Sequence, residues 1–260
     1  MDRKYIFFDI DHTLVSYVGG HHIPAETREA VRLLRNCGHV PAIATGRGAF
    51  LSQKVAEDLD IGLLVCANGA QILNNGKVLY LAPFPAQALE SFRETAARFP
   101  EHAAALDDHF LYTPGINQEF QEYFNMQAGY PCVRSLEEMT DAILCYLMLP
   151  PPLPEGCGLF SSPPDDILLE PMNHFVEARV AGTSKWLGIQ YVLKHLGAGS
   201  SDAVTFGDGL NDVEMLRSAS MSVAVGRAHQ KAKEAAKFLA EDIDEGGILK
   251  ACIDIGLIPA

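Results

Sequence analysis

The chain has 260 residues, of which 48% are hydrophobic, and it carries a net charge of −13. This acidity argues against a nucleic acid or an anionic membrane as a partner, because both attract clustered lysine and arginine. The six cysteines are scattered without a C-x-x-C pair, which predicts buried thiols in a reducing compartment. The N-terminal apolar run is too short for a signal peptide, and no stretch approaches the ~20 apolar residues of a membrane span, so we expect a cytoplasmic protein.

The first third of the chain alternates strand and helix patterns. Short apolar runs predict strands at residues 5–8, 39–44 and 63–67. Helical patterns fill the intervals, at residues 24–36 and from just after Arg47 to about Leu59. Strands separated by helices of this length indicate parallel βαβ units.

The same alternation returns near the C-terminus. The patterns predict a helix at 183–196, a strand at 203–206, a helix at 212–219, a strand at 222–225 and a helix at 230–239. Between these two parts, prolines and aromatic residues increase and the candidate strands look isolated. We therefore expect an α/β core domain built from residues 1–82 and 181–260, with residues 83–180 inserted as a second domain.

Polar and charged groups follow several of these strands. In open parallel sheets, ligands bind beyond the carboxyl ends of the strands, and there the sequence places Asp9, Asp11, Thr45, Arg47, Asn68 and the segment 207–212. Lys185 joins them from near the start of a helix. Each feature alone is weak evidence for an active site, since Asp-x-Asp occurs by chance in many proteins and an isolated lysine is most often a solvated surface residue. Their joint position at element ends is harder to explain as simple turn chemistry.

Four of these stretches together resemble the haloacid dehalogenase (HAD) superfamily of phosphatases, in its Cof-type branch with a large inserted cap (class IIB, C2 cap). The matching pieces are DIDHT at 9–13, ATGR at 44–47, GTSK at 182–185 and GDGLND at 207–212. ANGA at 67–70 and DIDEGGI at 242–248 also fit, whereas the cap matches only loosely. The resemblance implies a Rossmann-like three-layer α/β/α core with a parallel sheet and an inserted α+β cap.

The resemblance also assigns roles to the aspartates. It implies that Asp9 is the nucleophile that forms an aspartyl-phosphate, a choice that spacing alone leaves open between the two acids. Asp11 would protonate the departing alcohol and then activate water, as a general acid and base. Carboxylates next to a phosphate require a cation, and Mg²⁺ suits an all-oxygen site. The implied ligands are Asp9, the backbone carbonyl of Asp11, and Asp208.

The remaining motif residues suit phosphate binding. Thr45 offers a hydroxyl and Gly46 a backbone N–H at a helix start. Lys185 adds a positive charge that can pair with both Asp9 and the phosphate, and Asn211 can donate from its amide. We expect Asp212 to orient either Lys185 or a metal-bound water.

Other positions are left open by the sequence. His12 stands where relatives usually carry glycine, and it has either no chemical role or a substrate contact. By resemblance, Arg47 also contacts the substrate. In the cap, the candidates for contact with the leaving group are Asp108, His109, Tyr112 and His174.

The expected activity is Mg²⁺-dependent hydrolysis of a small phosphorylated metabolite, with a sugar phosphate favoured and the cap choosing the substrate. A phosphomutase or phosphotransferase of the same superfamily would use the same aspartates. A receiver-like signalling module also gathers acids, Thr and Lys around Mg²⁺, but the large insertion and Asp11 argue against it. We expect no nucleic-acid or membrane partner, and the oligomeric state is not predicted.

Overall fold

A computed structural model describes residues 2–107, 110–113, 133–171 and 174–259. The chain divides into two compact units. Unit 1 contains residues 1–46, 54–79 and 184–260, and unit 2 contains residues 47–53 and 80–183. Unit 2 therefore joins the continuous stretch 80–183 to seven residues that follow Gly46. The assignment of residues 83–180 to a cap that selects the substrate stays a prediction.

Unit 1 is organised around a sheet whose centre is parallel. Its strand order is β14-β13-β12-β1-β2-β3-β4-β5, with parallel pairing from β14 to β3 and antiparallel pairing of β3 with β4. The strands are β1 (Tyr5–Phe8), β2 (Val40–Ala44), β3 (Leu63–Cys66), β4 (Gln71–Asn74), β5 (Lys77–Leu81), β12 (Ala203–Gly207), β13 (Met221–Val225) and β14 (Phe238–Ala240). This is the predicted fold class, and it is confirmed.

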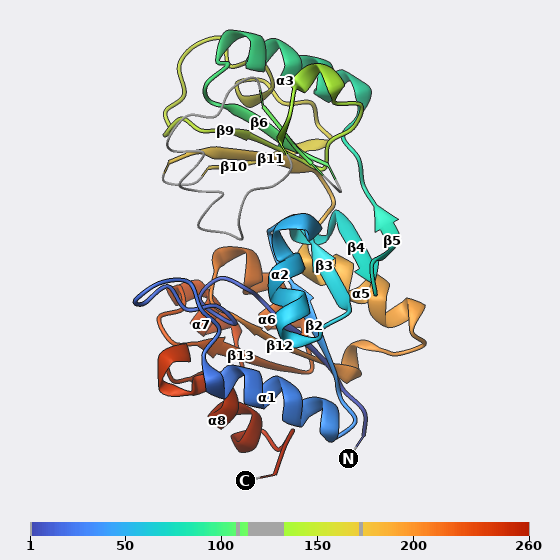
Figure 1. The fold of residues 1–260 in the computed structure, drawn as a ribbon, viewed down its shortest axis with the longest axis vertical. Coiled ribbons are helices and arrows are strands. Elements are labelled where there is room, and N and C mark those ends of the chain that lie inside the picture. The colour runs from blue at the N-terminus through green and yellow to red at the C-terminus, as the bar shows by residue number, and fades with distance from the viewer. Residues whose placement is uncertain (1, 108–109, 114–132, 172–173, 260) are drawn as a thin grey trace. The chain divides into compact units, whose positions relative to one another are not determined.

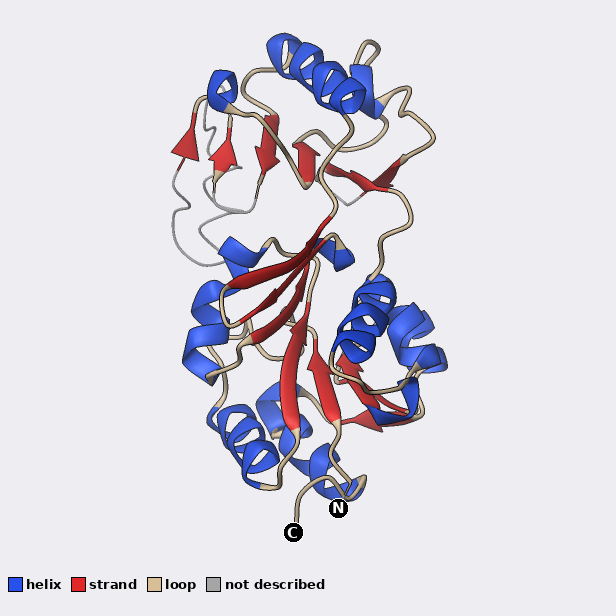
Figure 2. Cartoon of the chain, turned by 90° about the vertical axis from the view of Figure 1, so that its right-hand side faces the viewer, coloured by secondary structure: helices blue, strands red, loops and turns tan. Residues whose placement is uncertain are grey.

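Helices cover both faces of this sheet (Figure 2). The helices of this part of the chain are α1 (Ala25–Asn36), α2 (Ala49–Leu59), α5 (Lys185–His195), α6 (Val213–Ser218), α7 (Gln230–Ala235) and α8 (Gly247–Asp254), labelled in Figure 1. Side chains alternate between the faces of a strand, so Phe7 packs with Ile189 and Met215 of α5 and α6. On the opposite face Phe8 stacks on Phe206, with ring centroids 4.8 Å apart. A core strand buried on both faces explains the uninterrupted apolar run of β1.

One prediction in this unit is wrong. The helix expected at 230–239 ends at Ala235, and residues 238–240 form β14 instead. Tertiary contacts override the helical propensity there, because the backbone N–H of Lys237 donates to the carbonyl of Ser222 at 3.2 Å and its ammonium donates to the carbonyls of Ala219 and Ser220. Phe238 then pairs with Val223 of β13.

Unit 2 contains a separate sheet of strand order β10-β11-β9-β6-β7-β8, in which β7 and β8 are parallel and the other pairs antiparallel. Its strands are β6 (Ala103–Leu106), β7 (Leu111–Tyr112), β8 (Val133–Arg134), β9 (Leu144–Leu147), β10 (Ile167–Pro171) and β11 (Val176–Val180). Helix α3 (Ala86–Arg98) packs on one face and buries Phe92 in the core of the unit (Figure 1).

The described cysteines are free thiols. Cys37 is partly buried, and Cys66, Cys145, Cys157 and Cys252 are buried, whereas Cys132 lies outside the described residues. Among the helices that the structure describes, none has both the length and the apolar character needed to cross a membrane.

Candidate active site

The carboxyl ends of the central strands bring the predicted residues of unit 1 together. Asp9 follows β1, and its backbone N–H donates to the carbonyl of Phe206 in β12 at 2.9 Å. Thr45 follows β2 and is fully buried, and its carbonyl accepts from the backbone N–H of Asn68 at 3.0 Å. Asp208 follows β12. Because these strands are parallel, their ends meet at one edge of the sheet.

A buried lysine joins two carboxylates at this edge. The Nζ atom of Lys185 lies 2.8 Å from Oδ1 of Asp9 and 2.6 Å from Oδ1 of Asp212, and the three side chains are 1%, 8% and 0% exposed. Lys185 is the first residue of α5, whose start is fixed by Ser184, since the Ser184 hydroxyl accepts from the backbone N–H of Leu187 at 3.1 Å. One cation therefore neutralises part of the charge of two buried acids.

Asp212 also shapes the loop that carries Asp208. Its Oδ2 accepts from the backbone N–H groups of Asp208 at 2.9 Å and Gly209 at 2.8 Å. A Cβ at Gly207 would stand 2.5 Å from Cγ of Asp212, so only glycine fits beneath this carboxylate. The Thr13 hydroxyl donates to Oδ1 of Asp208 at 2.8 Å. Asp212 thus contacts both Lys185 and the turn, and its role in orienting Lys185 stays a prediction.

The carboxylates raise one another's pKa values. Burial, followed by repulsion from Asp212, raises the pKa of Asp208 to about 7. Burial and Asp212 likewise raise the pKa of Asp9 well above its ordinary value, although Lys185 opposes them. Burial alone would lower the pKa of Lys185, but Asp212 and Asp9 outweigh that effect and raise it. The site holds more negative charge than its lysine neutralises.

The same oxygens suit a hard divalent cation. Carboxylate oxygens of Asp9, Asp208 and Asp212 lie within 4.8 Å of one another. A metal ion at this place would meet only oxygen ligands, and its charge would offset the repulsion that raises the pKa values of Asp9 and Asp208. The residues present therefore fit a metal ion.

Two asparagine side chains of unit 1 meet beside Gly46. The Asn211 amide donates to Oδ1 of Asn68 at 3.0 Å, and a Cβ placed on Gly46 would be 3.4 Å from both side chains. Asn68 adopts the left-handed region, with φ 49° and ψ 39°, which asparagine tolerates better than most residues. The sequence marks Asn68 as a strand-end residue but leaves it outside the predicted site, and its contact with Asn211 arises only from the fold.

The loop after Asp11 contains a residue that sequence reasoning missed. The Tyr17 hydroxyl donates to Oδ1 of Asp11. His12 lies between them in sequence with φ 58°, and its ring contacts that of Tyr17. No motif spacing marks Tyr17, because the contact depends on how the loop folds back.

The remaining predicted residues belong to unit 2. Arg47 is buried, and its guanidinium donates to the carbonyl of Leu51 at 3.3 Å. Tyr112 is buried and donates to Oδ2 of Asp107 at 2.6 Å, whereas His174 is exposed. Asp108 and His109 lie outside the described residues. Substrate contact by these residues stays a prediction.

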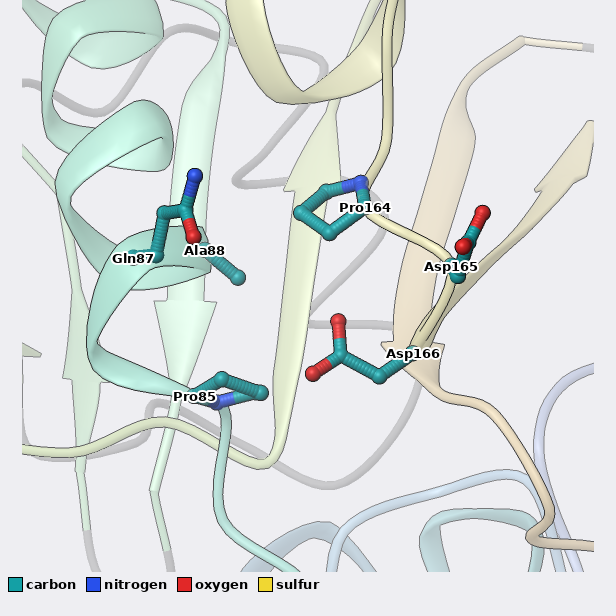
Figure 3. Close-up of a pocket in the computed structure, with 6 residues that line it drawn as sticks. All are labelled: Pro85, Gln87, Ala88, Pro164, Asp165 and Asp166. Atoms are coloured by element: carbon teal, nitrogen blue, oxygen red, sulfur yellow. The ribbon is translucent and has the colours of Figure 1, made fainter.

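Unit 2 also has a surface pocket of about 320 Å³ at the start of α3 (Figure 3). It is lined by Pro85, Gln87, Ala88, Pro164, Asp165 and Asp166. The two aspartates bring negative charge, and no lysine or arginine is among the lining residues. This pocket does not suit a phosphate group, in contrast to the edge of the sheet in unit 1.

The chain is similar to known proteins over nearly its full length. Residues 6–146 and 159–252 match the family model described as haloacid dehalogenase-like hydrolase. YkrA of Bacillus subtilis, a candidate phosphatase, is 31% identical over 267 residues that cover 99% of this chain and 100% of YkrA. A protein of Geobacillus kaustophilus has a solved structure with a TM-score of 0.86 at 29% identity, covering 99% of this chain and 100% of that one. The HAD subclass IIB sugar phosphatase BT4131 gives a TM-score of 0.82 at 28% identity, over 98% of this chain and 100% of that one.

Proposed function

We propose that this chain, which belongs to the haloacid dehalogenase-like hydrolase family, hydrolyses small phosphomonoesters through a phosphorylated Asp9 with the help of Mg²⁺. The chain is a phosphatase of the HAD type, as its family and relatives show. The metal, the intermediate, the residue roles and the substrate class are the proposal.

The observation that supports it most is the buried Asp9–Lys185–Asp212 arrangement at the end of the central strand. Lys185 contacts Oδ1 of Asp9 at 2.8 Å, and in the proposed reaction Oδ2 is the oxygen that attacks phosphorus. Asp212 holds Lys185 at 2.6 Å, so the ammonium keeps its position while the phosphoryl group arrives. An ion pair with a purely structural role would not be expected next to a third acid. Here Asp208 is that acid, and its pKa is raised to about 7 although Lys185 acts to lower it.

The chemistry proceeds in two displacements. Oδ2 of Asp9 bonds to phosphorus while the bond from phosphorus to the leaving alcohol breaks, and Asp11 gives its proton to that oxygen. Water then bonds to phosphorus as Asp11 takes back a proton, and the bond between phosphorus and Asp9 breaks. Inorganic phosphate leaves, and both aspartates return to their starting states.

The surrounding residues bind the phosphoryl oxygens. The Thr45 hydroxyl, the Gly46 N–H, the Asn211 amide and the Lys185 ammonium are all donors at the same edge of unit 1. Asp212, which accepts from Lys185 and from two backbone N–H groups, is a positioning residue.

Mg²⁺ would be held by Asp9, the backbone carbonyl of Asp11, and Asp208. When bound, it offsets the repulsion between the carboxylates and the phosphate dianion. The substrate class proposed is a small sugar-phosphate-like monoester, supported by the likeness to the sugar phosphatase BT4131. Residues 83–180 would form the cap that selects it.

The test is a screen of phosphorylated metabolites for phosphate release with Mg²⁺, ranked by kcat/KM. On the best substrate, Asp9→Asn is expected to lower kcat by at least about 10³-fold, because a nucleophile cannot be replaced by its neighbours. Asp60→Asn is the matched control, since that side chain is 91% exposed and pairs with Arg35 in unit 1. Full activity of Asp9→Asn, or of chelator-treated protein, contradicts the proposal, as does an isomerised sugar phosphate appearing by NMR in place of free phosphate.

A further inference from the structure

The loop that follows Asp11 places an aromatic side chain against the second aspartate. The Tyr17 ring lies between two histidine rings, with centroids 4.7 Å from His12 and 4.4 Å from His21. Its hydroxyl donates to Oδ1 of Asp11. Tyr17 and Asp11 are both half-buried, so the contact between them is partly shielded from water, whereas His12 is exposed.

Backbone contacts fix the loop in this shape. Ser16 and His22 exchange backbone hydrogen bonds of 2.8 and 3.1 Å, and these bonds close the loop around Tyr17. The Ser16 hydroxyl accepts from the backbone N–H of Val18 at 3.1 Å and donates to Asp244 at 2.8 Å. Tyr17 is therefore held from both sides along the chain, and its hydroxyl has a defined position.

The other end of the contact is also fixed. The carbonyl of Ile10 accepts from the backbone N–H groups of Leu14 and Val15, each at 2.8 Å, and the Ile10 side chain is fully buried. The backbone of Asp11 is thus immobilised by its neighbours. The Tyr17 hydroxyl adds a contact to the carboxyl of Asp11 itself.

We propose that Tyr17 is a positioning residue for proton transfer by Asp11, because its hydroxyl holds one carboxyl oxygen of that residue. This inference rests on the proposed function, in which Asp11 is the general acid and base. The Tyr17 O–H donates to Oδ1 and keeps its own proton throughout. Oδ2 then carries the proton that passes to the leaving oxygen and later receives the proton of the attacking water.

The same loop gives His12 a structural role. The residue adopts φ 58°, a region in which histidine is enriched among non-glycine residues, and its ring packs against Tyr17. A glycine here would relieve the backbone but would leave one face of the Tyr17 ring uncovered. His12 therefore helps to hold Tyr17, in addition to any substrate contact.

Leaving-group dependence separates this role from a general structural one. 4-Nitrophenol departs with little help from an acid, whereas phenol needs protonation, so only phenyl phosphate reports strongly on Asp11. Tyr17→Phe is expected to lower kcat/KM for phenyl phosphate about 10-fold, a part of the 10²–10⁴-fold that a general acid contributes, and for 4-nitrophenyl phosphate about 2-fold. The ratio of the two values cancels any loss of folded protein, because both are measured on one preparation.

Two further variants complete the test. Tyr191→Phe removes a hydroxyl that donates to the carbonyl of Leu79 at 2.9 Å, elsewhere in unit 1, and it is expected to leave the ratio unchanged. In an Asp11→Ala background, Tyr17→Phe is expected to change the ratio no further, because its acceptor is gone. An equal loss on both substrates, no loss on either, or a change that persists without Asp11 overturns the inference while the proposed function stands. Retained activity of Asp9→Asn instead overturns the proposed function.

Discussion

Replacing Lys185 by methionine tests how far the site depends on a single buried cation. The substitution keeps an unbranched side chain of similar size and removes the charge that lies 2.8 Å from Asp9 and 2.6 Å from Asp212. Removing one partner of a buried ion pair costs about 3–5 kcal/mol, because the remaining charge is left without compensation. At about 2–4 °C of Tm for each kcal/mol in a protein of this size, the expected decrease is on the order of 10 °C.

The pH dependence of this decrease has a definite sign. Lys185 lowers the pKa of Asp9, so without it that pKa rises further, and a protonated Asp9 needs no cation. The deficit of Lys185→Met relative to wild type is thus largest above the raised pKa of Asp9 and shrinks as the pH falls through it.

The assay is thermal unfolding followed by circular dichroism, in a chelator, at pH 8 and at pH 5. Lys250→Met is the matched control, because the Lys250–Glu241 pair is more than half exposed and solvent screens it. A Tm for Lys185→Met within about 2 °C of the control at pH 8 would refute the reasoning, since one kcal/mol corresponds to roughly that shift.

Three further outcomes are expected. Because the pKa of Asp208 is raised to about 7, ionisation of this carboxyl destabilises the metal-free protein as the pH rises from about 4 to 7. Mg²⁺ should therefore raise Tm more at pH 8 than at pH 5, and equal shifts would argue against Asp208 as a ligand. Gly207→Ala places a Cβ 2.5 Å from the Asp212 side chain and should lower the free energy of unfolding in urea by about 1–3 kcal/mol. Gly199→Ala, whose nearest contact is 3.7 Å, should lower it by less than about 1 kcal/mol. Asn211→Ala removes a proposed phosphate donor and should lower kcat/KM about 10-fold or more, and an unchanged value would exclude that role.

Much of the core sheet could be predicted from local sequence, because its strands carry their own signals. The predicted strand at 63–67 is β3 (Leu63–Cys66), and the predicted helix at 183–196 is α5 (Lys185–His195). A buried parallel strand is a short apolar run, and a helix has periodic apolar positions with caps. Both signals lie within about ten residues of chain.

The elements that sequence reasoning missed depend on contacts between residues distant in the chain or on the conformation of a short turn. The pair β4 and β5 extends the sheet through Asn75 and Gly76, which both have positive φ, as the Asn-Gly turn of a hairpin requires. The strand β14 forms only because β13 offers an edge with which it can pair. The helix α8 was likewise not predicted.

The candidate site divides in the same way. The motif residues Asp9, Lys185 and Asp208 could be named because they lie at the ends of elements that are visible in the sequence. The contacts of Asn68 with Asn211 and of Tyr17 with Asp11 could not be predicted, because the partners lie 143 and 6 positions apart without any periodic relation. Side chains that act through another side chain leave little trace in a single sequence.

The most direct test of the central claim is to trap the phosphorylated aspartate. The protein is mixed with 4-nitrophenyl phosphate and Mg²⁺, quenched in acid, treated with borohydride and digested for mass spectrometry, and Asp11→Asn is measured in parallel because loss of the base should slow hydrolysis of the intermediate. Homoserine is expected at position 9, in a larger fraction for Asp11→Asn than for wild type. Unmodified Asp9 in protein that is releasing phosphate, or homoserine at another position, would contradict this expectation.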